Sequence, residues 1–418
     1  RLSLVGSEMC IRGNQNTGDT YAYLEEIVTG QTLNYTLDGT SKLQYSKPSD
    51  PKTSYLTWET IATWNIGLDM SFLNNRLTFT GDYFIRNTEG MLADSYELPG
   101  VFGAKTPDEN CADLRTNGWE LYLGWNDSFA LMGKRFNYTV SATLGDNKTV
   151  FTKFNNPEKN LSNHYEGKVL GEIWGYRVDG LFASDEEAAE YTSKINQDAV
   201  NERILTDKVD PYYRAGDLKF RDLDGDNVIS KGDDTAYDAG DREIIGNETP
   251  RYMYSFRLGA DWNGFDLGIF FQGVGKRDWY PNYLSTGFWG PYSRAFTSFI
   301  PENFMDQCWS EENRDGYFPR FRGYQTFAGS QLGVNNDRYL QDASYIRLKN
   351  LTVGYTLPVL KKVFTKLRVY FTGENLWYWS PMLKHTKYID PEAAGGNGNT
   401  GMAYNYSRNF SVGVDITF

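Results

Sequence analysis

Residues 220–234, FRDLDGDNVISKGDD, carry acidic side chains at alternate positions of a short, glycine-containing stretch. This spacing matches a calcium-binding loop, in which side-chain oxygens and one main-chain carbonyl surround the ion. Carboxylates around a tight turn supply the hard oxygen ligands that calcium prefers. The stretch therefore predicts a structural calcium site. Its ligands, at loop positions 1, 3, 5, 7 and 12, would be Asp222, Asp224, Asp226, the carbonyl of Val228 and Asp233.

Two positions of this stretch depart from the usual calcium loop. Position 6 is normally glycine because the chain turns sharply there, and here it is Asn227, which also tolerates left-handed backbone. Position 12 is aspartate, whose side chain reaches less far than the usual glutamate. An acidic, solvated turn without a metal is the alternative interpretation.

A second group of residues with binding chemistry is the run of aromatic side chains between residues 274 and 345. Flat rings can stack on sugar faces or on peptide side chains, so we expect substrate contacts there. Packing of the same rings against neighbouring segments or a partner protein is the alternative, and the commoner use of such residues. The candidates for substrate binding are Trp279, Tyr280, Trp289 and Trp309, and Phe288 and Tyr292 belong to the same run.

Catalytic machinery is hard to find in this chain. It has two histidines, and its three cysteines, Cys10, Cys111 and Cys308, are widely spaced, so neither a zinc site nor a disulfide framework is indicated. No GxSxG, HExxH or phosphate-binding loop motif occurs. The formal net charge of -12 argues against nucleic acid, whose binding needs clusters of Lys and Arg. We therefore expect a protein that is not an enzyme and binds no nucleic acid.

The segments that must position these residues alternate between apolar and polar side chains. In TIATWNIGLDMSF the even positions from Ala62 to Phe72 are apolar, and the residues between them are polar or small, which is the period of a strand with one apolar face. About ten such strands of roughly 9 to 11 residues are expected, the length that crosses a bilayer as a tilted strand. They lie at 2–4, 62–72, 77–85, 119–125, 136–144, 254–262, 265–271, 351–357, 367–371 and 410–418.

The connections between these strands alternate between short and long, as in outer-membrane barrels with short periplasmic turns and long external loops. A soluble sandwich also has one apolar face per strand, but structureless loops of this length are uncommon in compact soluble domains. Aromatics at strand ends are interpreted as girdles at the lipid interface. They are Phe72, Trp119, Trp125, Phe136, Trp262, Phe265 and Phe418. The short links are 73–75, 127–135, 263–264 and 358–366, and the long segments are 12–58, 87–117, 146–251, 274–345 and 375–408.

Strand parity places the calcium pattern outside the cell. The long segment 146–251 joins an outward strand to an inward one, so it holds either no spanning strand or two. GEIWGYRVDGLF within it is strand-like, and we expect it to form structure in the external loop. SDEEAAEYTSKI predicts a short helix, because Ser184 and Glu187 have the spacing of a capping box.

Four stretches resemble the SusC-like TonB-dependent outer-membrane transporters of Bacteroidetes, and the ending NFSVGVDITF is similar to their last strand. The resemblance implies an all-β fold, a transmembrane antiparallel β-barrel of 22 strands with long extracellular loops. Residues 1–418 would form the C-terminal portion of that barrel domain, about ten strands, with the plug and the first strands not included. The stretches are GNQNTGD (13–19), the run 64–92, the run 216–275, and 339–376.

The resemblance also implies a function and partners. It suggests active import of oligosaccharides or oligopeptides across the cell outer membrane, together with a SusD-like surface lipoprotein and energised by TonB through the absent N-terminal part. A dimer of transporter and lipoprotein pairs is among the implied assemblies. The alternative is a secreted, calcium-stabilised, β-rich protein that binds or degrades glycans, which would need two converging carboxylates if it were a hydrolase.

Overall fold

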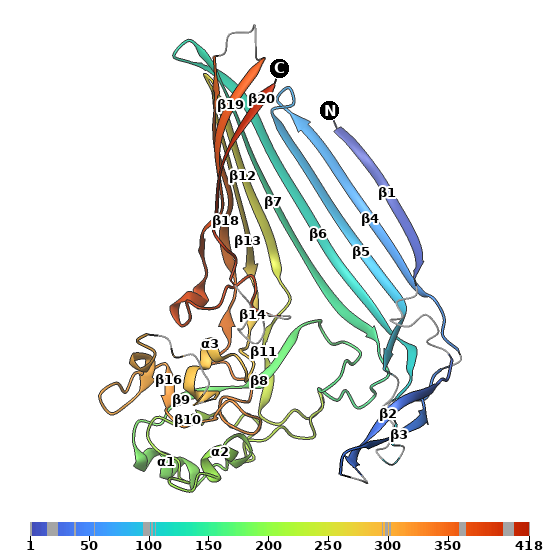
Figure 1. Cartoon of the computed structure of the whole chain (residues 1–418), viewed down its shortest axis with the longest axis vertical. Coiled ribbons are helices and arrows are strands. Elements are labelled where there is room, and N and C mark those ends of the chain that lie inside the picture. The colour runs from blue at the N-terminus through green and yellow to red at the C-terminus, as the bar shows by residue number, and fades with distance from the viewer. Residues whose placement is uncertain are drawn as a thin grey trace.

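Ten strands of the computed structural model form one antiparallel sheet (Figure 1). All ten strands predicted from the alternating pattern are present. The structure describes residues 2–14, 24–36, 39–53, 55–94, 101, 103–104, 106–294, 296, 300, 302–358, 365–395 and 405–417. In spatial order the strands are β1 (Leu2–Asn14), β4 (Glu59–Phe72), β5 (Leu77–Asp94), β6 (Asp108–Leu131), β7 (Lys134–Lys153), β12 (Arg251–Trp262), β13 (Phe265–Lys276), β18 (Tyr345–Leu357), β19 (Lys366–Trp379) and β20 (Asn409–Thr417).

The register keeps the apolar side chains of neighbouring strands on one face. Leu258 pairs with Val140 on one side and with Ile269 on the other, and Ile269 pairs with Leu351. Many large apolar side chains on this face are exposed, so no second layer of the described chain covers them, which argues against a sandwich. They include Trp64, Ile66, Tyr83, Leu121, Leu123, Val140, Leu144, Phe256, Leu258, Leu267, Val353, Val369, Phe371, Phe410, Val412, Val414 and Ile416.

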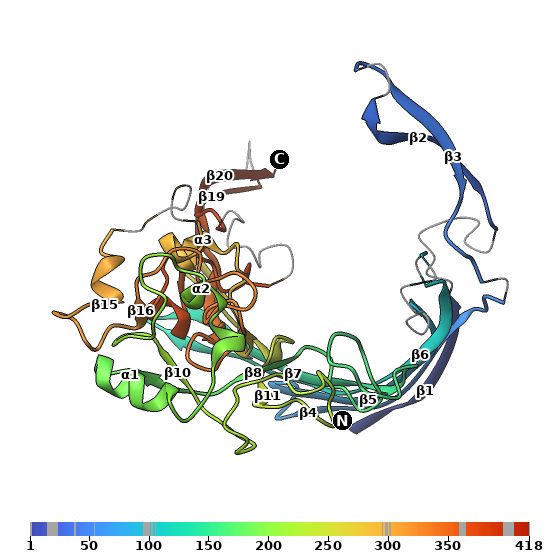
Figure 2. The same cartoon turned by 90° about the horizontal axis from the view of Figure 1, so that it is seen from below.

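The opposite face of the sheet is polar and is linked across strands. Thr143 and Ser255 share a hydroxyl hydrogen bond of 2.6 Å. Nearer the last strands, Arg368 donates to both carboxylate oxygens of Asp266, at 2.8 and 2.6 Å, and to Asp415 at 3.0 Å. Figure 2 shows the sheet curving into a trough whose edge strands, β1 and β20, do not meet.

Tight turns join the strands at one end of the sheet, where both ends of the chain also lie (Figure 1). The link between β12 and β13 is the two-residue turn Asn263–Gly264, with φ of 49° and 91°. Positive φ at both central residues defines the type I′ hairpin turn, which fits the twist of the strands and favours Asn-Gly. The long connections all lie at the opposite end, as parity predicted.

Several strands are much longer than expected, which corrects the predicted range of 9 to 11 residues. β6 has 24 residues, β7 has 20 and β5 has 18. Their ladders continue toward the long connections through polar sequence such as DENCADLRTNG at 108–118, where no apolar period marks a strand. The expected link 127–135 likewise shrinks to Met132–Gly133, because both flanks pair as strand.

The segment between β7 and β12 contains no strand of the large sheet, as expected. Its strands β8 (Glu172–Tyr176) and β9 (Val178–Leu181) pair with β11 (Arg242–Asn247) and β10 (Leu218–Phe220). Helix α1 (Asp185–Thr192) begins at the predicted cap: the Ser184 hydroxyl accepts from Glu187 N at 3.1 Å, and the Glu187 carboxylate accepts from the N–H of Ala183, the residue before the cap, at 2.7 Å. None of the described helices has the length and apolar composition to span a membrane.

The first long connection forms a separate hairpin, β2 (Ile27–Thr36) with β3 (Lys42–Pro48), which projects away from the sheet (Figure 2). Of the sequence features named above, residues 15–19 of the GNQNTGD stretch and Phe418 lie outside the described residues. The side chains of β1, including Cys10, also lie outside them.

Candidate functional site

The last three long connections at the loop end of the sheet fold together into one body with a shared aromatic core. We call residues 154–250, 277–294, 302–344 and 380–395 the cap. Phe318 in β16 (Phe318–Arg320) lies at the centre, with ring centroids 5.5 Å from Phe288, 5.8 Å from Tyr292 and 5.9 Å from Tyr339. The same cluster takes in Leu218 from one connection and Met382 from another. Residues far apart in sequence therefore fix the shape of the cap.

Two of the four aromatic residues proposed for substrate binding are buried, Trp289 inside this core and Trp309 outside it. Trp289 in α3 (Thr286–Trp289) is fully buried, and its indole N–H donates to the Pro281 carbonyl at 3.1 Å. Trp309 in β15 (Cys308–Trp309) packs so tightly on Gly216 that a Cβ there would come within 2.3 Å of the indole. Neither ring has a free face for stacking, so the packing alternative describes them and the stacking interpretation is corrected.

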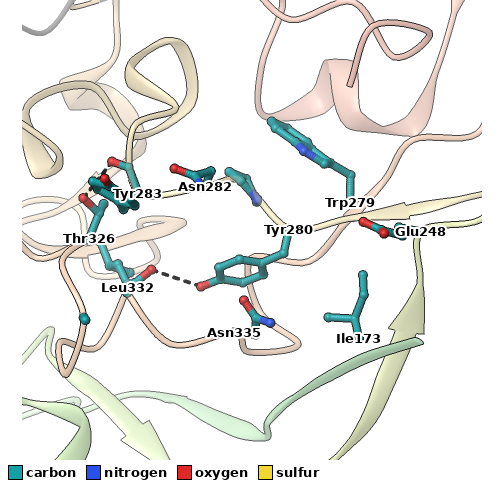
Figure 3. Close-up of a pocket in the computed structure, with 12 residues that line it drawn as sticks. Ile173, Glu248, Trp279, Tyr280, Asn282, Tyr283, Thr326, Leu332 and Asn335 are labelled. Atoms are coloured by element: carbon teal, nitrogen blue, oxygen red, sulfur yellow. Dashed lines mark hydrogen bonds between the residues drawn. The ribbon is translucent and has the colours of Figure 1, made fainter. Parts of the chain in front are cut away.

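The other two candidates, Trp279 and Tyr280, line a pocket of about 300 Å³ (Figure 3). Trp279 ends the short strand β14 (Asp278–Trp279) and is only 2% exposed, so it forms part of the pocket wall. The rim is exposed and includes Glu248, Tyr283 and Asn335. The full lining consists of Ile173, Glu248, Trp279, Tyr280, Pro281, Asn282, Tyr283, Thr326, Ala328, Leu332, Gly333 and Asn335.

Hydrogen bonds fix the frame of the pocket. The Tyr280 hydroxyl donates toward the carbonyls of Leu332 and Val334, at 3.2 and 2.8 Å. Burial raises the pKa of Tyr280 well above its ordinary value, so the hydroxyl stays protonated as a donor. The Thr326 hydroxyl donates to the Tyr283 carbonyl at 3.1 Å. These bonds join segment 279–283 to segment 326–335 across the pocket.

Most of the polar lining could not be identified from the sequence. Glu248 follows β11, and Asn282, Thr326 and Asn335 come from a different long connection. Only the shared core brings these segments together, and no spacing in the sequence signals it. The aromatic run around Trp279 was the one available signal, and it pointed to one wall.

The acidic loop brings three of its predicted calcium ligands together. Carboxylate oxygens of Asp222, Asp224 and Asp226 lie within 4.8 Å of one another. The turn between them uses left-handed backbone at Gly225 and Asn227, with φ of 82° and 67°, as expected for position 6. Asp222 accepts from the N–H groups of both turn residues, at 2.7 and 3.0 Å.

Asp233, the predicted ligand at position 12, is not part of this carboxylate group. The acid that closes the loop is Asp241, which is fully buried and accepts from Leu223 N at 2.7 Å and from Ser230 N at 2.8 Å. Burial raises the pKa of Asp241, and the charges of Asp224 and Asp222 add to that rise. The three gathered carboxylates are a donor set that suits calcium. Asp241, which like Asp233 lies outside that group, closes the turn through its two backbone hydrogen bonds.

The two histidines pack on aromatic rings. The His385 ring stacks on Tyr317 at 3.6 Å, and the His164 ring stacks on Phe151 at 4.2 Å. Burial lowers the pKa of His385 to about 4, with help from Lys384 and Arg338, and burial also lowers the pKa of His164. Both side chains are therefore neutral packing groups near pH 7.

A buried ion pair attaches the last part of the cap to the sheet. Arg347 in β18 donates to Asp390, and each side chain is only 1% exposed. Arg347 Nε also lies 3.0 Å from a Glu392 carboxylate oxygen, and Lys349 donates to Glu392 at 2.8 Å. The segment 389–392 is thus held on the sheet by two cations of one strand.

Comparison with known proteins identifies relatives of this chain. The TonB-dependent receptor P3 of Formosa agariphila is 28% identical over 392 residues, 87% of this chain and 34% of that protein. The TonB-dependent receptor SusC of Bacteroides thetaiotaomicron is 24% identical, over 98% of this chain and 37% of that protein. The chain thus spans about a third of the length of these relatives. No protein-family profile matches it.

The fold is also similar to solved structures. The structure of the RagAB peptide transporter aligns with a TM-score of 0.69 at 23% identity and covers 100% of this chain and 41% of that one. The RagAB peptide importer in its 'open-open' state gives a TM-score of 0.67 at 22% identity, over 40% of that chain. The open sheet is therefore similar to part of a larger transporter barrel.

Proposed function

We propose that this chain, which corresponds to the C-terminal part of the SusC-like TonB-dependent transporters, works in an importer of oligosaccharides or oligopeptides. In this proposal the sheet is barrel wall in the outer membrane, its polar face lines the lumen, and the cap lies outside the cell. The chain moves solutes and makes or breaks no covalent bond.

The observation that carries the proposal is the uncovered apolar face of the sheet. The nine strands of the sheet from β4 to β20 keep their apolar side chains in phase, and many of those side chains are exposed, which in water would be costly and in lipid is favourable. The open edges at β1 and β20 would pair with further strands of the whole transporter.

Aromatic residues on the apolar face lie at two levels, and the distance between these levels matches the thickness of the apolar band of an outer-membrane barrel. At the turn end, Phe129, Phe136, Trp262, Phe265 and Tyr355 form one row across five paired strands. Trp119 lies ten residues along β6 from Phe129, which is about 33 Å along the strand. At a tilt of roughly 40° this is about 25 Å across the membrane, the height of the apolar band in outer-membrane barrels.

The similarity to SusC-like transporters also suggests partners for the whole protein. A SusD-like surface lipoprotein would bind the cap side, and TonB would supply energy through an N-terminal part. Two such pairs would form the dimeric assembly. Support comes from the relative named SusC and from the RagAB peptide transporter, whose chain this one covers in part.

We further propose a structural calcium ion at the acidic loop, held by Asp222, Asp224, Asp226 and the carbonyl of Val228. The ion would neutralise charges that otherwise repel one another beside the buried Asp241. Its role would be to brace the cap, since millimolar external calcium saturates even a weak site.

Fractionation tests the importer proposal. The whole transporter, expressed with its lipoprotein, should stay in the outer-membrane pellet after salt washing and be released by detergent. It should also import labelled oligopeptides or oligosaccharides only when TonB is present. Recovery of the protein from the soluble fraction without detergent would refute the barrel and would favour a secreted glycan-binding protein or enzyme.

A further inference from the structure

The cap pocket carries a carboxylate and no basic side chain. Among its lining residues Glu248 is the only acid, and none is Lys, Arg or His. Glu248 is exposed, and its hydrogen bonds within the described chain are made by its backbone, from its N–H to the Gly171 carbonyl at 2.8 Å and to its carbonyl from Arg277 Nε at 3.3 Å. The carboxylate itself is therefore available to a ligand.

The charge of the neighbouring cation Arg277 interacts with that of Glu248, but its hydrogen bonds go to main-chain carbonyls and not to this carboxylate. Besides the Glu248 carbonyl it donates to the Pro391 carbonyl at 3.5 Å, and a Cβ on Gly395 would lie 2.2 Å from its guanidinium. The guanidinium is thus enclosed by the 391–395 segment. It leaves the charge of Glu248 at the pocket rim without an ion-pair partner in the described chain.

The other polar groups of the pocket add a second acceptor. Asn335 uses its side-chain N–H to donate to the Trp174 carbonyl at 3.1 Å, so its oxygen is the group left for a ligand. The Tyr280 hydroxyl is turned toward two carbonyls, which leaves its ring as pocket wall. Figure 3 shows the Tyr280 ring beside Asn335, with Glu248 between Trp279 and Ile173.

We propose that this pocket binds a cationic group, an ammonium or a guanidinium, of an oligopeptide substrate. A carboxylate, an amide oxygen and an aromatic ring are the three groups that favour a cation in a partly dry site. A volume of about 300 Å³ holds one side chain or a chain terminus, not a whole oligomer. The inference rests on the proposed importer function and narrows its substrate from oligosaccharide or oligopeptide to oligopeptide.

Charge decides between peptide and neutral sugar at this site. Sugar hydroxyl groups would offer Glu248 hydrogen bonds alone, whereas an ammonium or guanidinium would add an ion pair to them. A basic side chain or a peptide N-terminus satisfies the carboxylate directly.

Binding of three blocked tripeptides to the purified transporter and lipoprotein complex tests the inference. The probes are N-acetyl-Ala-Lys-Ala-amide, N-acetyl-Ala-norleucine-Ala-amide, and Ala-norleucine-Ala-amide with a free N-terminus. They separate a side-chain cation from a terminal one. Calorimetry should show either or both charged probes binding roughly tenfold more tightly than the neutral one, which is about 1.4 kcal/mol.

The variant Glu248→Gln should abolish this preference. Glu312→Gln is the matched control, because Glu312 is an exposed acid of the cap outside the pocket, and it should keep the preference. Equal binding of all probes by the unmodified complex, or a preference that survives in Glu248→Gln, would overturn the inference.

Uptake of the same probes separates this inference from the proposed function. Import of all three without a charge preference would support the importer proposal and refute the cation site. Import of oligosaccharides with no peptide import would overturn the peptide assignment alone. A protein that imports neither and is found in the soluble fraction would overturn the importer proposal itself.

Discussion

The orientation of the sheet predicts opposite effects for two substitutions at the same height. Leu258 lies on the apolar face, 39% exposed, four residues from Trp262 at the turn end. Four residues are about 13 Å along a strand and about 10 Å across the membrane at a tilt of roughly 40°. Because the apolar band is about 25 Å tall, Leu258 lies near the midplane of the bilayer.

Leu258→Arg should therefore destabilise the barrel by about 2 to 4 kcal/mol, the cost of a basic side chain near the membrane midplane. Thr139 is the matched control. It pairs with Gly259, next to Leu258, so its side chain has the same height on the polar face. Thr139→Arg should cost much less, because its charge would meet water in the lumen.

Denaturant unfolding of the whole transporter in phospholipid vesicles measures both effects, followed by the loss of heat-modifiable migration on gels. Leu258→Arg should lower the midpoint clearly, and Thr139→Arg should stay near the unmodified protein. A larger loss for Thr139→Arg than for Leu258→Arg would refute the assignment of the apolar face to lipid.

Three further predictions concern the cap. After EDTA treatment and return of calcium, metal analysis should show reversible uptake that is lost in the double variant Asp222→Ala with Asp224→Ala; unchanged uptake would exclude this loop. The pKa of His385 is lowered from its usual value of 6.5 to about 4, so below pH 6.5 the unfolded chain takes up a proton that the folded cap does not, and stability falls as pH drops toward 4. His385→Phe should reduce this fall in the thermal unfolding temperature of the cap while changing little at pH 7.5, and an identical pH profile would contradict it. Arg347→Met should lower the free energy of unfolding by about 3 to 5 kcal/mol, because it leaves the buried Asp390 charge without a partner, whereas adding Asp390→Leu should recover much of the loss. Limited proteolysis of segment 380–395 reports both effects, and equal cleavage in the single and double variants would contradict the role of the pair.

The sheet could be predicted because its strands and tight turns depend on residues that are close together in the sequence. Each strand alternates apolar and polar side chains over many residues, as from Ala62 to Phe72, and a tight turn such as Asn263–Gly264 depends on residue types next to it. The order of strands then follows from hairpin connections. The extra length of β6 was missed because its first half is mostly polar and is linked across strands by hydrogen bonds, such as the one from Arg115 Nε to Asn87 at 3.0 Å, which leaves no apolar period in the sequence.

The cap could not be predicted because its structure depends on contacts between residues that are far apart in the sequence. Trp289 and Trp309 are chemically suited to stacking, yet packing against residues distant in sequence buries both side chains. Three of the predicted calcium ligands lie together and Asp233 lies outside that group, whereas the acid that hydrogen-bonds across the turn is Asp241, eight residues further along the chain. A linear motif assigns the residue at the expected position, whereas the folded chain brings in a later one.

The division of the cap pocket into a buried wall and an exposed rim has a consequence for how this protein can diversify. Trp279 belongs to the aromatic core, so changing it would disturb the whole cap. Glu248, Tyr283 and Asn335 lie at the surface, where substitutions are usually nearly neutral for folding. A library restricted to these three positions should therefore yield transporters with altered cargo and intact folding. Substitution at the same positions would let natural relatives differ in the substrate that they import.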